Sequence, residues 1–581
     1  RLATPDSSIR NAFIHINLDI HLTSALYFYQ RPISQILSPL GPIYPPPTNL
    51  SNDPTFATAV QDITSILGQV TSSNGSLSNT SISVQIFDAT ESGPLLNFAY
   101  TADNINTTLG VSKVDQDTVF RVGSVSKLWT MVLFLIEEGL WPFQEPVARF
   151  IPELARAGRE LQWDPRKRRD GIDYVHWGHV SMGELASHLA GIARDYGVLD
   201  LSGMGSQMEQ LGFPALQPSE IPPCGNPNPC SREQFFNGLL QSHPIVPTSS
   251  TPIYSNAAFQ ILAYALEAMT DQSYAELLQR DIIAPLGLNG TYYTTPNISL
   301  GVIPNDMGEY WWNFDLGDEG PAGAIYSSTR DMATLGQAIL SNSLFPSFIT
   351  RRWMKPATHT SSLDYSVGAP WEIVSFGDER PIDIYSKAGD IGSYSSIIAL
   401  SPDHNVGFTV LAAGADGHAK VALAADLISV ILLPALEQSA KEQASAKFDG
   451  DYAATDGFNS SIALTTDDGP GLLVTSWVNN GTDMIQSLMT MGHVTDPDTF
   501  SIRLYPTGLE SPGQMSFRAL MPPALSTAGN GPFTSSCISW VVVDGQVYGN
   551  VGIDEFVINL DETEIVKSIT PRVLRTTLPK T

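Results

Sequence analysis

Three short motifs of nucleophilic, basic and amide side chains follow one another along the chain. They are Ser124-Val-Ser-Lys127, Tyr254-Ser-Asn256 and Lys387-Ala-Gly389. A serine hydroxyl is a weak nucleophile until a neighbouring group takes its proton, and lysine and tyrosine are two side chains that do so. Together the motifs contain every group that acyl transfer to a serine needs, without a histidine. This set of residues predicts an enzyme.

The spacing of the first motif places a hydroxyl and an amine on one face of a helix, because residues three apart lie one turn from each other. The largely apolar run that follows Lys127, ended by Gly139 as a C-cap, predicts a helix that begins at Ser124. The N-terminus of a helix stabilises negative charge on an oxygen. We therefore expect Ser124 to be the nucleophile and Lys127 to accept its proton.

The second and third motifs supply groups that would tune this pair. Burial and a second cation such as Lys387 lower the pKa of a lysine, which would favour the neutral form of Lys127. Tyr254 is expected to share the proton transfer, because two lysines stabilise a phenolate. Asn256 is expected to orient Lys127 by a hydrogen bond. The predicted catalytic residues are thus Ser124, Lys127, Tyr254, Asn256 and Lys387.

At these residues the chain resembles the serine β-lactamase and penicillin-binding-protein superfamily, in its class C and esterase-like branch. The signature of that branch is Ser-x-x-Lys, Tyr-x-Asn and Lys-Thr-Gly. Further segments resemble the family in kind and order, at residues 120–127, 185–192, 254–262, 283–288 and 321–331. The likeness covers residues from about 50 to about 440, and secreted β-lactamase-like proteins of filamentous fungi are the most similar group. It implies an α+β fold, with an antiparallel sheet flanked by helices and a separate helical lobe.

The resemblance also implies an oxyanion hole, formed by the backbone N–H groups of Ser124 and Asp390, with Gly389 lining the substrate site. The third motif departs from the family, because Ala388 replaces a threonine or serine and removes a hydroxyl donor. An aspartate at 390 would repel the carboxylate of a β-lactam. We therefore expect little or no β-lactamase activity, and an ester, lactone or amide as substrate.

Two other features have both a structural and a functional interpretation. His188 is a possible base, but we expect a packed structural histidine, because Lys127 and Tyr254 already fill that role. The aromatic cluster Tyr310-Trp-Trp-Asn-Phe314 is expected to pack in the core, as large apolar side chains usually do. Trp311 and Trp312 are nevertheless candidates for lining an acyl or aromatic substrate pocket.

The length of 581 residues predicts more than one domain. We predict an N-terminal extension over 1–47, a catalytic domain over 48–440 and a β-rich C-terminal domain over 441–581. A β-hairpin over 81–100, strands between 382 and 412 and an apolar helix over 419–436 belong to the catalytic part. The C-terminal part shows short alternating segments, at 461–465, 472–477 and 539–543, separated by Gly, Asp and Pro turns, which indicate an all-β domain.

Charge and cysteine content point to the secretory route. The chain has 31 basic and 59 acidic residues, a net charge of −28, which argues against nucleic acid and anionic membranes as partners. Cys224 and Cys230 are expected to close a small disulfide loop, with a metal pair as the alternative, although no further ligands stand nearby. The chain begins at Arg1, which would fit a signal peptide already removed. From the sequence we expect no apolar run long enough to span a bilayer.

Eight glycosylation sequons support the same compartment. They stand at Asn49, Asn74, Asn79, Asn106, Asn289, Asn297, Asn459 and Asn480. We thus expect a secreted serine hydrolase with a small-molecule acyl substrate and no cofactor or metal. The alternatives are an acyltransferase or transpeptidase that uses the same intermediate, and a binding glycoprotein that has kept the fold and lost the reaction.

Overall fold

The computed structural model describes residues 41–225, 228–377, 380–455, 457–521 and 539–581. These residues divide into two compact units. One contains Asn49–Phe376 and Ile382–Pro434, and the other contains residues 41–48, 377, 380–381 and the described residues of Ala435–Thr581. The predicted extension over 1–47 thus lies mostly outside the described residues.

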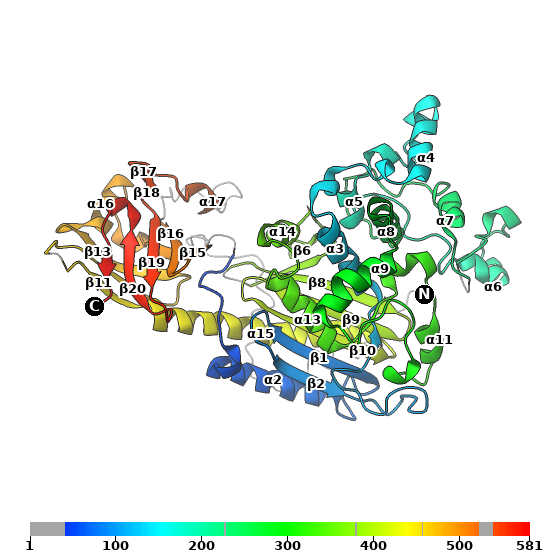
Figure 1. The fold of residues 1–581 in the computed structure, drawn as a ribbon, viewed down its shortest axis with the longest axis horizontal. Coiled ribbons are helices and arrows are strands. Elements are labelled where there is room, and N and C mark those ends of the chain that lie inside the picture. The colour runs from blue at the N-terminus through cyan, green and yellow to red at the C-terminus, as the bar shows by residue number, and fades with distance from the viewer. Residues whose placement is uncertain (1–40, 226–227, 378–379, 456, 522–538) are drawn as a thin grey trace. The chain divides into compact units, whose positions relative to one another are not determined.

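An antiparallel sheet of eight strands forms the centre of the first unit (Figure 1), in the order β2-β1-β10-β9-β8-β7-β6-β5. The strands are β1 (Thr80–Asp88), β2 (Pro94–Tyr100), β5 (Thr358–His359), β6 (Tyr365–Val367), β7 (Glu372–Phe376), β8 (Ile382–Ile391), β9 (Tyr394–Ser401) and β10 (Val406–Gly414). Every residue of β1 and β10 is buried, because these central strands are covered on both faces. The predicted hairpin and strands are confirmed, as is the predicted α+β fold class.

Helices flank the sheet and form a lobe beside it, shown in cyan and green above the sheet in Figure 1. They are α2 (Pro54–Thr71), α3 (Ser126–Glu137), α4 (Pro152–Trp163), α5 (Met182–Ala186), α6 (Gly205–Gln210), α7 (Arg232–Leu239), α8 (Ala257–Thr270), α9 (Tyr274–Leu278), α10 (Ala284–Leu286), α11 (Gly308–Asn313), α12 (Gly320–Gly323), α13 (Thr329–Leu340) and α14 (Ser347–Trp353). Helix α13 packs on β1, β9 and β10, and α2 packs on β2. A short ladder joins β3 (Phe120–Arg121) to β4 (Tyr326–Ser327).

Two helices, α3 and α8, are buried over most of their length and pack against each other and against α12. Residues 126–135 and 257–266 are all buried, and most of them are apolar. A helix that is apolar on every side belongs in a core rather than at a surface. Because the first two motifs stand at the N-terminal ends of these two helices, the packing of α3 on α8 brings the motifs together.

Helix α15 (Gly417–Phe448) is longer than the predicted helix over 419–436. By length and composition alone it is long and apolar enough to cross a membrane, so our sequence estimate that no such segment exists is wrong. Half of its most apolar window is buried within the protein. Its buried positions recur at helical spacing, at Val421, Ala424, Ala425, Ile428, Leu432 and Leu436. This spacing is what a core helix of a folded unit shows.

The second unit is built on an antiparallel sheet of nine strands. They are β11 (Gly450–Ala453), β12 (Ser461–Thr465), β13 (Leu472–Asn479), β14 (Thr482–Asp483), β15 (Arg503–Ser511), β16 (Gln514–Leu520), β19 (Glu555–Leu560), β20 (Val566–Pro571) and β21 (Leu578–Pro579). A bridge between Tyr452 and Lys580 joins the first strand to the last, so the sheet closes on itself. A small hairpin, β17 (Val547–Tyr548) and β18 (Val551–Gly552), and helix α16 (Met484–Met491) complete it.

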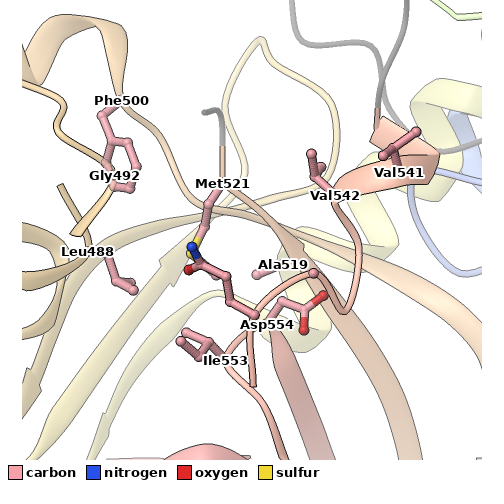
Figure 2. A pocket seen from close by; sticks show the side chains of 11 residues that line it. Leu488, Gly492, Phe500, Ala519, Met521, Val541, Val542, Ile553 and Asp554 are labelled. Atoms are coloured by element: carbon pink, nitrogen blue, oxygen red, sulfur yellow. The ribbon is translucent and has the colours of Figure 1, made fainter. Parts of the chain in front are cut away.

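The predicted strand over 539–543 is wrong, because Ser539–Val542 forms the short helix α17. Its large side chains at 540 and 541 are both exposed, so the alternating pattern does not bury one face as a strand would. Beside α17 lies a pocket of about 340 Å³. Figure 2 shows apolar side chains around it together with Asp554, the one charged side chain among its described lining residues. Arg518 and the amide of Asp544 already bind the Asp554 carboxylate, each at 2.8 Å.

Candidate active site

Ser124 occupies a single 3₁₀ turn, Gly123–Val125, that leads directly into α3. The predicted helix therefore begins with one tighter turn before its α-helical body. Of residues 120–135, Ser124 is the one that is not buried. Ser124 is thus the partly exposed residue of an otherwise enclosed segment.

Lys127 lies one turn further along α3 and has no exposed surface. Its Nζ donates to Ser124 Oγ at 3.0 Å, to Asn256 Oδ1 at 2.6 Å and to the carbonyl oxygen of Ala322 at 2.8 Å. These three acceptors match the three N–H donors of a charged amine. Burial lowers the pKa of Lys127, Tyr254 opposes this effect, and Lys387 adds to it.

Tyr254 precedes α8, and three cations surround its ring. Lys127 Nζ, Arg194 Cζ and Lys387 Nζ lie 4.9, 5.0 and 5.4 Å from the ring centroid. Burial by itself raises the pKa of Tyr254, but the charges of Lys127 and Lys387 and hydrogen bonds with Lys127 and Ser124 outweigh it, so the net pKa is lowered. The structure thus brings the three sequence motifs to one place.

Lys387 is 1% exposed on β8 and pairs with Glu372 at the start of the neighbouring strand β7. Glu372 accepts from Lys387 Nζ at 2.5 Å through one carboxylate oxygen and from the amide of Ala388 at 2.8 Å through the other. Burial opposes the charge on Lys387, but Glu372 and Tyr254 outweigh it and raise its pKa. Lys387 is therefore a fixed cation. Glu372 was not predicted from the sequence, because it belongs to none of the three motifs.

The Ser124 turn touches the end of β8 through two glycines. A methyl group built on Gly389 would lie 2.2 Å from the carbonyl oxygen of Val122 and 2.6 Å from the amide nitrogen of Ser124. A methyl group on Gly123, whose φ is +47°, would lie 2.6 Å from the amide nitrogen of Asp390. Backbones approach this closely only where no side chain intervenes. The two amides predicted to form an oxyanion hole therefore lie on abutting segments.

Asp390 differs from our expectation that its charge is presented to the substrate. Its carboxylate accepts from Ser395 Oγ at 2.7 Å and is paired with His418 Nδ1 at 2.8 Å. The side chain of Asp390 is 45% exposed and that of His418 is 72% exposed, so this is a surface pair. Ser395 and His418 thus occupy both carboxylate oxygens of Asp390, which weakens the predicted repulsion of an anionic substrate.

His188 is buried and stacks on the Tyr254 ring, with centroids 4.4 Å apart. Its Nδ1 accepts from the amide of Ser255 at 3.2 Å. Burial, followed by the charges of Lys127, Lys387 and Arg194, lowers the pKa of His188 far below its usual value. A neutral imidazole that packs against the tyrosine agrees with the structural role expected for it.

The two tryptophans of α11 have different surroundings. Trp312 is fully buried against Tyr326 and Tyr394, so the prediction that it lines a substrate pocket is wrong. Trp311 is only partly buried and stacks over Gly392, just beyond β8; a methyl group there would lie 1.9 Å from its ring. Its position next to the strand that carries Lys387 keeps Trp311 as a candidate lining residue.

Other predicted residues lie away from Ser124. The disulfide between Cys224 and Cys230 is confirmed. The side chain of Asn106 is partly buried and accepts from the backbone and hydroxyl of Thr108. The other seven sequon asparagines are exposed, as glycosylation requires: Asn49, Asn74, Asn79, Asn289, Asn297, Asn459 and Asn480. Within the described residues, no group of three or more His, Cys, Asp or Glu side chains is placed to hold a metal ion.

The chain is similar to known proteins over most of its length. The family model described as beta-lactamase matches residues 96–433, and a model described as a beta-lactamase-like C-terminal domain matches residues 440–581. A beta-lactamase-like protein of Arthroderma benhamiae is 30% identical over 574 residues, which cover 90% of this chain and 92% of the relative. The probable hydrolase M10 of a Phoma species is 27% identical over 430 residues, with coverages of 71% and 68%.

Among solved structures, the beta-lactamase/D-alanine carboxypeptidase of Yersinia pestis is 19% identical, with a TM-score of 0.46, and the match covers 65% of this chain and 98% of that one. The family model spans more than half of the chain, and the Arthroderma relative matches nearly all of it. The chain belongs to the beta-lactamase family of hydrolases, as the resemblance in its motifs indicated.

Proposed function

We propose that the protein is a serine hydrolase that acts on an ester, lactone or amide through an acyl-enzyme on Ser124. The observation that supports this most is the hydrogen bond of 3.0 Å from Lys127 Nζ to Oγ of the partly exposed Ser124, beside a tyrosine of lowered pKa. A nucleophile within hydrogen-bond reach of its activating groups is the arrangement that acyl transfer needs.

The geometry favours Tyr254 over Lys127 as the group that takes the Ser124 proton. All three N–H donors of Lys127 have acceptors, so a charged amine fits better than a neutral one. In the proposed reaction, the Tyr254 phenolate accepts the proton while Ser124 Oγ bonds to the substrate carbonyl carbon. Tyr254 then returns the proton to the leaving group as its bond to carbon breaks. In the second step, Tyr254 takes a proton from water while the water oxygen bonds to the acyl carbon. Tyr254 then returns the proton to Ser124 Oγ as the bond between serine and the acyl group breaks, and the acid is released.

The amides of Ser124 and Asp390 would hold the oxyanion in both steps. Two such donors stabilise the transition state and supply a large part of the rate enhancement of acyl transfer. Lys387, fixed by Glu372, would keep the Tyr254 phenolate stable between proton transfers. We propose low β-lactamase activity mainly because Ala388 lacks a hydroxyl donor, since Ser395 and His418 already bind the Asp390 carboxylate. The eight sequons and the disulfide support secretion as part of the same proposal.

The test is labelling with a fluorophosphonate, which bonds to activated serines. The wild type and Ser73→Ala, which removes an exposed serine in another turn, should label at the same rate. Ser124→Ala should not label, while its melting temperature stays within a few degrees of the wild type. Labelling of Ser124→Ala would refute the assignment of the nucleophile. No labelling of the wild type would favour the binding glycoprotein that has lost the reaction. Nitrocefin turnover at the level of a true β-lactamase would refute the proposed substrate preference.

A further inference from the structure

The side-chain amide of Asn256 lies between Lys127 and Asp195. Its Oδ1 accepts from Lys127 Nζ at 2.6 Å, and its Nδ2 donates to Asp195 Oδ1 at 2.7 Å. The two ends of an amide have nearly the same shape but opposite hydrogen-bonding character. With the amide reversed, its NH₂ group would face the Lys127 amine, donor against donor. Whatever fixes the orientation of Asn256 therefore decides whether Lys127 has an acceptor there.

Asp195 is held beside Asn256 by the backbone. The carbonyl oxygen of Arg194 accepts from the amides of Asn256 at 2.8 Å and Ala257 at 3.0 Å, at the start of α8. The Asp195 side chain is 21% exposed, and its second oxygen lies 3.5 Å from Arg194 Nε. Because the contact that begins α8 also delivers this carboxylate to Asn256, the Asp195–Asn256 bond is built into the fold.

Glu319 interacts with Asp195 and is 6% exposed. It is hydrogen-bonded to Asp195, and it immediately precedes α12, whose Ala322 accepts from Lys127 Nζ. Burial, followed by the charge of Asp195 and the bond to it, raises the pKa of Glu319 far above its usual value, although Lys127 and Arg194 oppose this. Two carboxyl groups in contact do not both ionise, so they share one proton. Glu319 is the more buried of the two and its pKa is raised, so Glu319 donates this hydrogen bond and Asp195 accepts it.

We propose that Glu319 and Asp195 are positioning residues that act on the nucleophile through Asn256, which deepens and rests on the proposed function. The relay consists, in order, of Glu319, Asp195, Asn256, Lys127 and Ser124. The buried acid keeps Asp195 in place as an acceptor. Asp195 fixes which end of the amide faces Lys127, and the correctly turned amide holds the Lys127 amine against Ser124 Oγ. Neither Glu319 nor Asp195 touches the reacting atoms.

The competing explanation is that the carboxyl pair only anchors the segment 317–323 to the lobe. The two explanations differ in what the folded protein does. An anchor contributes to stability but leaves the reactivity of Ser124 unchanged in molecules that are folded. A relay changes that reactivity, and its members act through one shared group, so their substitutions are not additive.

The experiment measures the rate constant for fluorophosphonate labelling of Ser124 well below the melting temperature of each variant. Glu319→Gln keeps a donor toward Asp195 and should label within about threefold of the wild type. Glu319→Leu and Asp195→Ala should each label about 10- to 100-fold more slowly, the size expected for losing a hydrogen bond within a charged network. The double variant should label no more slowly than Asp195→Ala alone.

A matched control is Asp331→Asn. Asp331 is another buried carboxyl group, on α13, whose Oδ2 accepts from Thr291 Oγ1 and the amide of Gly290, both at 2.8 Å. It should lower the melting temperature without changing the labelling rate. Glu319→Leu at the wild-type rate, or a double variant slowed by the product of the two single effects, would overturn the relay. Glu319→Gln as slow as Glu319→Leu would overturn the assignment of Glu319 as the neutral donor.

A crystal structure of Asp195→Ala would show the positions of the Asn256 amide and of Lys127 Nζ directly, without a labelling reagent. We expect the Asn256 amide to turn and Lys127 Nζ to move out of hydrogen-bond range of Ser124 Oγ. If Lys127 Nζ and Ser124 Oγ stayed 3.0 Å apart, as in the wild type, the relay would be overturned whatever the labelling shows. A wild type that fails to label while Lys127 does move in Asp195→Ala would instead refute the hydrolase and leave the relay standing as a structural fact.

Discussion

Gly389→Ala tests whether the end of β8 sets the geometry of the nucleophile. The added methyl group would lie 2.2 Å from the carbonyl oxygen of Val122, more than 1 Å inside the 3.4 Å at which ordinary contacts begin, and 2.6 Å from the amides of Ser124 and Val125. All three atoms are backbone, so no flexible side chain can yield, and either β8 or the Ser124 turn must move by about 1 Å. A displacement of that size at a reacting group costs about 100-fold in rate.

The assay is the rate of fluorophosphonate labelling, with the free energy of unfolding measured by urea denaturation. We expect labelling about 100-fold slower and a loss of about 1–3 kcal/mol of stability, the usual cost of overpacking. The matched control is Gly158→Ala, in the interior of α4, where nothing lies within 4 Å of the added methyl group. That variant should label normally and gain about 0.5–1 kcal/mol, because alanine favours a helix over glycine.

Two results would refute this reasoning. Gly389→Ala with normal stability would mean that β8 and the Ser124 turn do not touch. Gly389→Ala with lowered stability but normal labelling would mean that they touch and that the contact does not control the nucleophile. Gly123→Ala approaches the same contact from the other side, where its methyl group meets the amide of Asp390. It should slow labelling in the same way.

Three further outcomes are expected. Lys387→Met should shift the pH profile of Ser124 labelling to higher pH, because Lys387 lowers the pKa of Tyr254 and its loss raises that pKa; an unchanged profile would contradict the electrostatic role of the lysine. Glu372→Leu should cost about 3–5 kcal/mol in denaturation, because it leaves a lysine side chain that is 2% exposed without its carboxylate, and Lys387→Met in the same chain should restore part of the loss. Peptide N-glycosidase should lower the mass of protein secreted by a eukaryotic host, and an unchanged mass would argue against use of the seven exposed sequons.

Local geometry explains which parts of the site were predictable from the sequence. Ser124 and Lys127 are three residues apart on one helix, so their contact follows from helical spacing alone. The β1–β2 hairpin and the Cys224–Cys230 loop are local in the same sense. Tyr254 and Lys387 were placed at the site by the chemistry of their side chains and the order of the motifs, not by any spacing in the chain. Glu372 had neither kind of signal, since it reaches Lys387 only through the pairing of β7 with β8.

The remaining errors also have physical causes. Asp195 meets Asn256 across 61 positions of sequence, through a contact that exists only once the lobe has folded. Trp311 and Trp312 are adjacent and chemically identical, and only the packing of α11 decides that one is enclosed in the core and the other is not. The segment 539–543 has strand-like composition, yet a composition does not show which neighbour would bury one face of it.

The two lysines of the site show how the same side chain acquires opposite properties. Both are almost fully buried, and burial alone disfavours the charged form of each. Lys387 contacts the Glu372 carboxylate, which compensates its charge and raises its pKa. The acceptors of Lys127 in Ser124, Asn256 and Ala322 are a hydroxyl, an amide and a carbonyl, which satisfy its hydrogen bonds without supplying a negative charge. Tyr254 opposes the effect of burial on Lys127 but does not outweigh it, so the pKa of Lys127 is lowered. The Asp195 carboxylate is held one amide away, where it orients the Asn256 acceptor without a direct bond to the amine.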